Sequence, residues 1–253
     1  MHQLGLIGKS LSHSFSKLYF EEKFRREHIP DFSYDLFELS DIQQITDFIR
    51  QRSHLVGFNV TIPYKQQIIP FLNRLSEEAA AVGAVNTVVI QHLDGQIITT
   101  GHNTDITGFR QSLQGRTIPE RALILGTGGA AAAVIYVLEK MGCRCTVVSR
   151  NPERGLPYSD LTPETISDHK LIVNCTPLGT DPNTNEKPDI PYVGISGEHF
   201  LYDLVYNPSE TAFLKEGIRR GAKTQNGLPM LHAQAEAAWL LWVEMQNFAF
   251  LQK

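Results

Sequence analysis

The stretch A-L-I-L-G-T-G-G-A-A at residues 122–131 decides the fold class of the second half of the chain. It predicts a short buried strand from Ala122 to Leu125, a glycine-rich turn, and a helix from Ala130 to Met141. The turn fits the G-x-G-x-x-A pattern of a dinucleotide-binding loop, in which glycines let the backbone approach a pyrophosphate. The amino end of the helix would offer N–H groups and a positive dipole to that anion. A glycine-rich turn without a ligand is the alternative, and the strand and helix on either side favour the nucleotide.

The same pattern continues toward the carboxyl end. Further buried strands are expected at 143–148, 171–175 and 200–205, and short apolar strands that alternate with helices imply a parallel sheet with crossovers. Segment 151–160 contains two prolines and a glycine, so the crossover helix there should be short or absent. Residues 179–191 should form an exposed loop.

The first hundred residues mix strands and helices, and the chain closes on an apolar helix. The polar face of one strand would carry Asn59 and Thr61, while Phe58, Val60 and Ile62 point the other way. The expected elements are a strand at 4–7, a helix at 17–27, a strand at 55–62, a helix starting at Pro63, a hairpin of 85–90 and 96–100 around Asp94-Gly95, and a helix from Met230 to Phe250.

Composition excludes several classes of protein. The 253 residues suggest one to two domains, and 42% hydrophobic with 20% charged residues is ordinary globular usage. A net charge of −4 gives no basic excess for nucleic acid, and the longest uncharged run, 122–138, is too short to span a bilayer. Three cysteines without a disulfide framework and a start without a basic leader favour a soluble cytoplasmic protein, and no metal site is expected.

The end of the strand after the glycine-rich turn bears on the choice of cofactor. A ribose without a 2′-phosphate usually meets an acid there, but S-R-N-P-E-R at 149–154 has no acid before Glu153. Arg150 and Arg154 suit a 2′-phosphate, because a guanidinium pairs with phosphate in a fork. The alternative is that both arginines are solvated loop charges.

Several polar residues outside this turn could perform chemistry. Lys65, on the first turn of a helix, could present its ammonium to a substrate oxygen, and Asp105 precedes another helix. Ser14 and Ser16 look like caps for the next helix, whose amino end would also bind a carboxylate. Taken singly, Lys65 and Asp105 read as a surface lysine and a first-turn acid, Asn86 as a turn residue, and Gln234 as the edge of an apolar stripe.

Together these motifs resemble the shikimate dehydrogenase family. They follow the order of that family and run nearly from end to end of the chain. They are S-H-S-F-S at 12–16, N-V-T-I-P-Y-K at 59–65, G-A-V-N-T at 83–87, N-T-D at 103–105, G-T-G-G-A at 126–130, N-C-T-P-L-G at 174–179, Y-D-L-V-Y at 202–206 and N-G-L-P-M-L-H-A-Q at 226–234.

The resemblance implies a two-domain α/β enzyme that reduces 3-dehydroshikimate to shikimate with NADPH. Residues 1–104 plus 229–253 would form an α/β substrate-binding catalytic domain. Residues 105–228 would form a Rossmann-like NADP-binding domain with a parallel sheet, separated from the first by a cleft. The only partner implied is the small-molecule substrate, with no nucleic acid and no membrane, and the protein would be a monomer or homodimer.

The resemblance also assigns roles to residues. Lys65 would be catalytic and coupled to Asp105, and Ser14 and Ser16 would hold the substrate carboxylate. The substrate hydroxyls or ring would contact Thr61, Asn86, Asp105, Tyr206 and Gln234. The cofactor would contact Gly126, Thr127, Gly128, Gly129 and Ala130 at its pyrophosphate, Ser149, Arg150, Asn151 and Arg154 at its adenosine, Leu204 and Gly227 at its nicotinamide, and Glu77.

The sequence departs from the family pattern at a few positions. Ser149 and Asn151 flank Arg150 where the family usually has N-R-T and a basic residue, and His102 stands where an acid is common. Thr180 and Leu204 replace methionines. One alternative is an NAD-dependent quinate/shikimate dehydrogenase, against which the missing acid at 149–151 counts. Another is a catalytically silent NADP-binding regulatory module, which need not keep Lys65, Asp105, Ser14 and Gln234 together. Strict NADP use, as opposed to dual NAD and NADP use, and activity on quinate stay open.

Overall fold

The computed structural model describes residues 1–11, 14–93 and 95–245. Part of the S-H-S-F-S motif, the hairpin residue Asp94 and the predicted helix end at 246–250 lie outside the described residues. The chain divides into two compact units, the first made of Met1–Thr104 and Gln234–Lys253 and the second of Asp105–Ala233. The chain therefore returns to the first unit at Gln234, inside helix α9 (Leu228–Met245). The sequence predicted this return at residue 229.

The first unit is built on a six-stranded mixed sheet with the order β2-β1-β3-β5-β6-β4. β1 runs parallel to β2 and β3, and the predicted hairpin is confirmed by antiparallel β5 and β6. The strands are β1 (His2–Gly8), β2 (Phe32–Glu38), β3 (Gly57–Val60), β4 (Arg74–Leu75), β5 (Thr87–Leu93) and β6 (Gln96–His102). The helices, besides α9, are α1 (Ser16–Arg26), α2 (Ile45–Arg50), α3 (Tyr64–Gln67) and α4 (Glu77–Val82).

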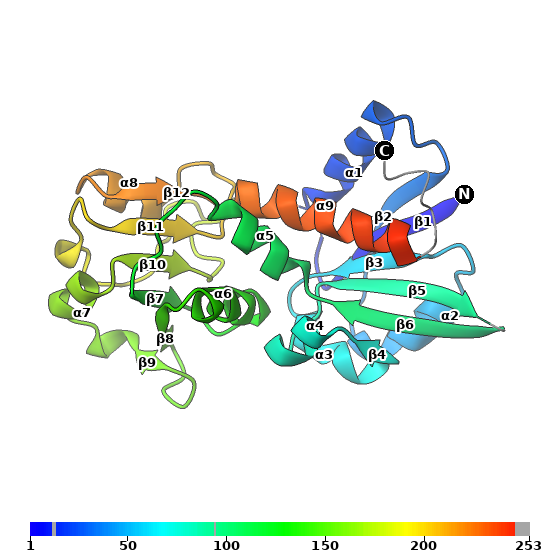
Figure 1. Cartoon of the computed structure of the whole chain (residues 1–253), viewed down its shortest axis with the longest axis horizontal. Helices are drawn as coiled ribbons and strands as arrows, with labels where there is room; N and C mark the ends of the chain where they lie inside the picture. The colour runs from blue at the N-terminus through cyan, green and yellow to red at the C-terminus, as the bar shows by residue number, and fades with distance from the viewer. Residues whose placement is uncertain (12–13, 94, 246–253) are drawn as a thin grey trace. The chain divides into compact units, whose positions relative to one another are not determined.

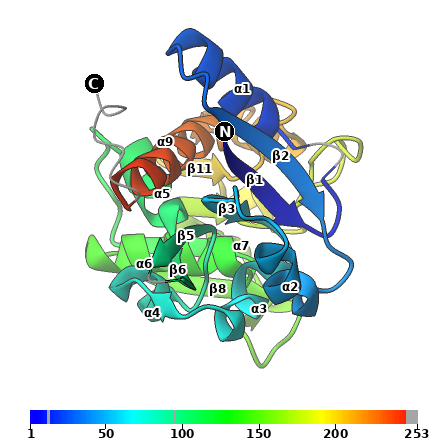
Figure 2. The ribbon, with the colours of Figure 1, turned by 90° about the vertical axis from the view of Figure 1, so that its right-hand side faces the viewer.

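Helices cover both faces of this sheet (Figure 2). α1 and α9 supply one core cluster, and the side chains of α2 and α3 join a second cluster on the other face. The predicted alternation in β3 is confirmed for Phe58 and Val60, which enter the second cluster, and for Asn59, which hydrogen-bonds to Tyr34 instead. Ile62 breaks the prediction, because the strand ends at Val60 and Ile62 is 69% exposed.

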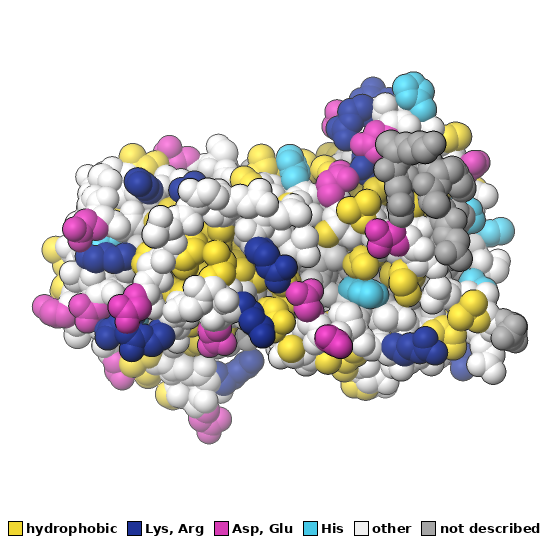
Figure 3. All heavy atoms as spheres, in the orientation of Figure 1, with side chains coloured by type: hydrophobic (Ala, Val, Ile, Leu, Met, Phe, Trp, Pro, Cys, Tyr) yellow, Lys and Arg dark blue, Asp and Glu magenta, His cyan; other side chains and the backbone are white. Residues whose placement is uncertain are grey.

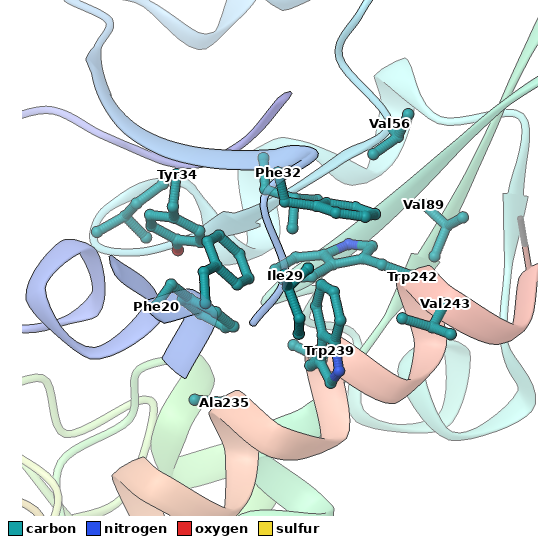
Figure 4. Packing of buried hydrophobic residues seen from close by; sticks show 14 of the residues in the cluster. Phe20, Ile29, Phe32, Tyr34, Val56, Val89, Ala235, Trp239, Trp242 and Val243 are labelled. Carbon is teal, nitrogen blue, oxygen red and sulfur yellow. The ribbon is translucent and has the colours of Figure 1, made fainter. Parts of the chain in front are cut away.

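Aromatic rings fill the core between α1, α9 and the sheet (Figure 4). Phe20 stacks on Tyr34 with ring centroids 4.4 Å apart, and Trp239 meets Phe32 edge-on at 5.1 Å. Trp242 is fully buried and donates from Nε1 to the carbonyl of Val88 at 3.0 Å. A Cβ on Gly57 would lie 2.3 Å from the same Nε1, so β3 needs a glycine where the indole crosses it.

Two predictions about helix starts are wrong. Ser16 is the first residue of α1 rather than its cap, and the N-cap is Phe15, whose side chain makes no capping hydrogen bond. The Ser14 hydroxyl, one residue before the N-cap, accepts from the backbone N–H of Ser16 at 3.3 Å. Pro63 is the residue before α3 rather than its first residue, although Lys65 does lie in the first turn as predicted.

The second unit contains a six-stranded, all-parallel sheet, as predicted, with the order β12-β11-β10-β7-β8-β9 (Figure 1). The order reverses at β7, so the chain winds outward in both directions from that strand. The strands are β7 (Arg121–Leu125), β8 (Arg144–Ser149), β9 (Leu156–Pro157), β10 (Leu171–Asn174), β11 (Phe200–Asp203) and β12 (Lys223–Gln225). The helices are α5 (Thr104–Ser112), α6 (Gly129–Lys140), α7 (Pro163–Asp168) and α8 (Ala212–Ile218).

Helices also cover both faces of the second sheet. α7 and α8 share a core cluster with residues such as Leu123 and Leu201, and α5 packs on the other face through Phe109, whose ring lies 5.1 Å from that of Tyr202. Between β8 and β9 the described chain contains no α-helix, which agrees with the short crossover predicted for 151–160.

The surface charges, the helices and the possible metal ligands of the protein bear on its partners. On the face drawn in Figure 3, Lys and Arg side chains are interspersed with Asp and Glu. Across 1–11, 14–93 and 95–245, no helix combines the length and apolarity needed to cross a membrane. The same residues contain no group of three or more His, Cys, Asp or Glu that could hold a metal ion.

We predict that Trp242→Ala lowers the free energy of unfolding of the first unit by about 3–5 kcal/mol, because it leaves a large cavity and removes the bond to Val88. Both tryptophans of the chain, Trp239 and Trp242, belong to this unit. The fluorescence of the remaining Trp239 therefore reports its unfolding in denaturant. A loss below about 1 kcal/mol would show that the cluster is not the main core of the unit.

Candidate active site

The glycine-rich turn lies where the strand order of the second sheet reverses. Gly126 follows β7 with a φ of 114°, a conformation that L side chains rarely adopt. Its backbone N–H donates to Val148 at the end of β8, and a Cβ there would lie 3.3 Å from Thr176 in the loop after β10. The carboxyl ends of β7, β8 and β10 therefore converge on this turn, as in ligand sites of open α/β sheets.

The turn has the features that a pyrophosphate requires. Gly128 is the N-cap of α6, and no described side chain caps that helix. A Cβ on Gly128 would meet nothing within 4 Å, so the protein leaves space for a close approach to this backbone. Gly126 through Ala130 are all at least partly exposed. The twelve-residue helix α6 directs its amino-terminal N–H groups and dipole to the same place, so the turn fits a dinucleotide.

The loop after β8 is ordered by its own side chains. The Ser149 hydroxyl accepts from Asn151 N–H, and the Asn151 side chain accepts from Glu153 N–H, both at 3.0 Å. Arg154 donates to the carbonyl of Thr127 at 3.0 Å, which joins this loop to the glycine-rich turn. Arg150 is exposed. The structure thus brings the residues predicted for the pyrophosphate and for the adenosine to one edge of the sheet.

A buried polar cluster holds the loops after β10 and β11. The Asp203 carboxylate accepts from Asn174 at 2.9 Å, from the N–H of Val205 at 3.0 Å and from the Thr211 hydroxyl at 2.6 Å. The Asn174 side chain in turn accepts from the N–H and the hydroxyl of Thr176. Burial raises the pKa of the Asp203 carboxyl to about 6, against the hydrogen bonds that lower it.

The predicted nicotinamide contacts lie beside this cluster. A Cβ on Gly227 would come within 2.1 Å of the Leu204 carbonyl oxygen, so the two segments approach as only a glycine allows. The Gly227 N–H donates to the Val205 carbonyl at 3.2 Å. Tyr206 is half-buried two residues after Leu204. The Asp203 cluster therefore sets the path of the segment that carries Leu204 and Tyr206.

In the first unit, the side chain of Asn86 joins three other polar residues. Its Oδ1 accepts from the Thr104 N–H at 2.7 Å and from the Thr104 and Thr87 hydroxyls at 3.1 Å. Its Nδ2 donates to Gln234 Oε1 at 3.4 Å. Asn86 is 2% exposed and Thr87 is fully buried. Asn86 and Gln234, distant in sequence, are thus brought together as the resemblance implied.

Lys65 and Thr61 are placed next to this group by the backbone. The Val85 N–H donates to the Lys65 carbonyl at 2.7 Å, which ties α3 to the residue before Asn86. The Thr61 carbonyl accepts from the Tyr64 N–H at 2.9 Å, and the Tyr64 hydroxyl donates to Leu39 at 2.6 Å. α3 is only four residues long, so these bonds rather than helix length hold Lys65 in position.

Ser14 and Ser16 lie at the start of α1 in the first unit, and both are partly exposed. Burial raises the pKa of the Tyr34 phenol, and Ser16 opposes that rise. Glu77 is exposed in the first turn of α4. The structure places the substrate residues Ser14, Ser16, Thr61, Asn86 and Gln234 in the first unit, together with Lys65.

Asp105 belongs to the second unit and is 5% exposed. It lies in the first turn of α5, whose last residue, Ser112, anchors the helix to the sheet. The Tyr202 hydroxyl donates to the Ser112 hydroxyl at 2.8 Å, and Gln225 donates to the Ser112 carbonyl at 3.0 Å. Asp105 is thus fixed to the same sheet as the glycine-rich turn.

Known proteins resemble the chain over nearly its whole length. The model for the shikimate dehydrogenase substrate-binding domain matches residues 6–88. A shikimate dehydrogenase (NADP(+)) of Clostridium botulinum is 39% identical over 256 residues, which covers 96% of each chain. The chain belongs to the shikimate dehydrogenase family. The structure of the Thermus thermophilus shikimate 5-dehydrogenase in complex with NADP(H) and shikimate has a TM-score of 0.83 at 31% identity, covering 96% of this chain and 94% of that one.

Another member of the same structural group differs in cofactor and substrate. A quinate dehydrogenase from Corynebacterium glutamicum in complex with NAD has a TM-score of 0.84 at 27% identity, covering 96% of this chain and 94% of that one. The shape of the fold therefore does not distinguish the two activities.

Sequence reasoning assigned no role to several buried polar residues that lie near the predicted site residues. Tyr34, Asn59, Thr87 and Thr104 in the first unit, and Asn174 and Asp203 in the second, carry the hydrogen bonds described above. Their signal in the sequence is a polar residue within or at the end of an apolar strand, as in the F-N-V run of β3. That signal does not tell which partner each residue finds.

We predict that the stability of the wild type relative to Asp203→Asn falls by up to about 3 kcal/mol between pH 4 and pH 7. The raised pKa means that the folded wild type binds a proton that the unfolded chain has lost between about pH 4 and pH 6. Wild-type stability therefore falls as the pH rises through that range and then levels off. The amide carries no charge to desolvate, so denaturation curves at pH 4 to 8 should diverge with rising pH. Parallel curves would contradict the burial of an ionised carboxylate.

Proposed function

We propose that the protein catalyses the reversible NADPH-dependent reduction of 3-dehydroshikimate to shikimate. The observation that carries this proposal is the likeness to enzymes named shikimate dehydrogenase (NADP(+)) across nearly the whole chain. The residues that the family resemblance assigns to the substrate support it, because five of the seven, with Lys65, lie in one unit and Asn86 bonds to Gln234 there. In this proposal the first unit is the substrate-binding catalytic domain and the second is the NADP-binding domain.

The chemistry requires a hydride and a proton. NADPH, when bound, supplies the hydride. Lys65 donates the proton to the ketone oxygen, and its positive charge stabilises the oxyanion that develops there. Asp105 acts with Lys65 as a coupled pair. The hydroxyls of Ser14 and Ser16 hold the substrate carboxylate, while Thr61, Asn86, Tyr206 and Gln234 orient the ring and its hydroxyls.

We assign NADP rather than NAD from the loop after β8. Arg150 and Arg154 supply positive charge there, and Arg154 reaches the glycine-rich turn through the Thr127 carbonyl. The loop has no acid before Glu153 to accept from an unphosphorylated ribose. An NAD-dependent quinate/shikimate dehydrogenase is the second candidate, favoured by the likeness to the quinate dehydrogenase bound to NAD. A cofactor absorbance assay with shikimate and with quinate, run separately with NADP and NAD, decides between them.

The cysteines support a cytoplasmic location. Cys143, Cys145 and Cys175 are free thiols. Burial raises the pKa of all three, that of Cys145 to about 12, which disfavours the reactive thiolate. Three unpaired and unreactive thiols fit a reducing compartment.

We predict that Lys65→Met lowers kcat by about 10²–10⁴-fold or more while shikimate KM changes much less. The substitution keeps most of the volume of the stem and deletes the charge. The oxyanion that Lys65 stabilises develops only near the transition state. Removing the charge should therefore lower kcat rather than raise KM. Steady-state kinetics with circular dichroism as a folding control measure this. A folded variant with near-normal kcat and a raised KM would make Lys65 a binding residue.

Ser14→Ala provides the contrasting prediction. The substrate carboxylate is charged before and after hydride transfer, so the Ser14 hydroxyl binds ground state and transition state alike. Its removal should raise shikimate KM by about tenfold and leave kcat nearly unchanged. If kcat fell instead with KM constant, Ser14 would have to take part in the chemical step.

We predict that Arg150→Ala weakens NADP binding by about 1–3 kcal/mol and changes NAD binding little, because only NADP carries the 2′-phosphate. Titrations with the two cofactors measure both affinities. Glu153→Ala, in the same exposed loop, is the matched control and should not weaken NADP binding. Equal losses for NADP and NAD in Arg150→Ala would remove the argument for 2′-phosphate recognition.

A further inference from the structure

A continuous chain of buried side chains runs beneath the substrate residues of the first unit. It begins at the Tyr34 phenol on β2, a side chain that is 2% exposed. The Tyr34 hydroxyl donates to Asn59 Oδ1 at 2.8 Å, and Asn59 Nδ2 donates to Thr87 Oγ1 at 3.0 Å. Thr87 then reaches Asn86 Oδ1 at 3.1 Å. The chain ends at Asn86, which the proposed function places on the substrate.

Two backbone groups fix the orientation of both amides in it. Asn59 Nδ2 faces the carbonyl of Asn86 at 3.2 Å, and a carbonyl can only accept, so this end of the Asn59 amide must be its NH₂. Asn86 Oδ1 faces the Thr104 N–H at 2.7 Å, and an N–H can only donate, so this end of the Asn86 amide must be its oxygen. If the Asn59 amide flipped, its oxygen would face the Asn86 carbonyl oxygen. If the Asn86 amide flipped, its NH₂ would face the Thr104 N–H.

The hydroxyls follow from the amides. Asn59 Oδ1 can only accept, so Tyr34 gives its one proton to Asn59. Thr87 accepts from Asn59 and gives its own proton toward Asn86 Oδ1 or Thr104 Oγ1, each 3.1 Å away. Asn59 and Thr87 are 6% and 0% exposed. Each amide of this buried network therefore has a single orientation.

We propose that Thr87 and Asn59 are positioning residues that hold the Asn86 amide with its NH₂ end toward Gln234, and that Tyr34 in turn holds Asn59. This inference rests on the proposed function, since it needs Asn86 to contact the substrate. It assigns to buried residues, which do not touch the substrate, a share of the affinity for its hydroxyls. Losing one of them should therefore affect substrate binding and spare the cofactor.

The test is steady-state kinetics of Thr87→Val in the full chain, with shikimate and NADP. The substitution keeps the shape of the side chain and removes the hydroxyl. We expect shikimate KM to rise about tenfold, NADP KM to stay at the wild-type value, and Thr87→Ser to restore shikimate KM. In the Asn86→Ala background, Thr87→Val should add nothing, because Thr87 acts through Asn86.

Thr99→Val is the matched control for a purely structural effect. Thr99 is a buried threonine on β6 of the same sheet, 4% exposed, and its hydroxyl donates to Asn73 at 2.8 Å. It should lose comparable thermal stability and keep wild-type KM values. Tyr34→Phe keeps the ring stacked on Phe20 and removes only the hydroxyl, so it serves if Thr87→Val fails to fold. It should raise shikimate KM and leave NADP KM unchanged.

The outcomes separate the two proposals. A wild-type protein that does not oxidise shikimate with NADP refutes the proposed function. An active wild type with unchanged shikimate KM in folded Thr87→Val, or in Tyr34→Phe if Thr87→Val does not fold, refutes only the positioning role. An effect of Thr87→Val that adds fully to that of Asn86→Ala, or that Thr99→Val reproduces, also overturns it.

Discussion

The side chain of Asn86 holds the two points at which the chain leaves and re-enters the first unit. Thr104 is the last residue before the second unit and Gln234 the first after it, and both hydrogen-bond to the Asn86 amide. Bringing Thr104 and Gln234 together closes a long loop of chain, which costs conformational entropy. Interactions between the two ends of that loop must offset this cost. Because Asn86 is buried, its amide must find these partners in the folded state.

The position of α9 depends on the residues around Gln234. Glu236, two residues after Gln234, accepts from the Tyr19 hydroxyl and pairs with the Lys23 ammonium at 2.8 Å. Lys23 is 4% exposed and lies over the Trp239 ring at 5.7 Å, so its charge is met by carboxylates and its stem by aromatic surface. Gln234 therefore begins a segment that α1 holds by charge and the aromatic core holds by packing. The start of α1 carries Ser16, so one helix pair supports both ends of the proposed substrate site.

The second unit uses a related arrangement at its own strand ends. β7 sits at the reversal of strand order, so the loops after β7 and β10 must come close. Asn174 and Asp203 are the last residues of β10 and β11. They fix the loops after these two strands by hydrogen-bonding to Thr176, Val205 and Thr211. Burying Asp203 is unfavourable for its ionised form, which is why its pKa rises. The hydrogen bonds of the buried Asp203 offset this cost in part, and they order the loops beside the glycine-rich turn.

The sequence by itself determined the elements and the family of this protein. The period of apolar residues and the G-T-G-G-A turn gave the parallel sheet of the second unit, and the ordered motifs gave the shikimate dehydrogenase family, because these features are local in the chain. The sequence misjudged Ile62 and the capping role of Ser16, since a strand end and an N-cap depend on neighbours outside the segment. Only the tertiary structure decided which buried polar groups meet. Tyr34, Asn59 and Thr87 lie on three different strands, and the Asn59 amide has a single orientation only because the fold places the Asn86 carbonyl beside it.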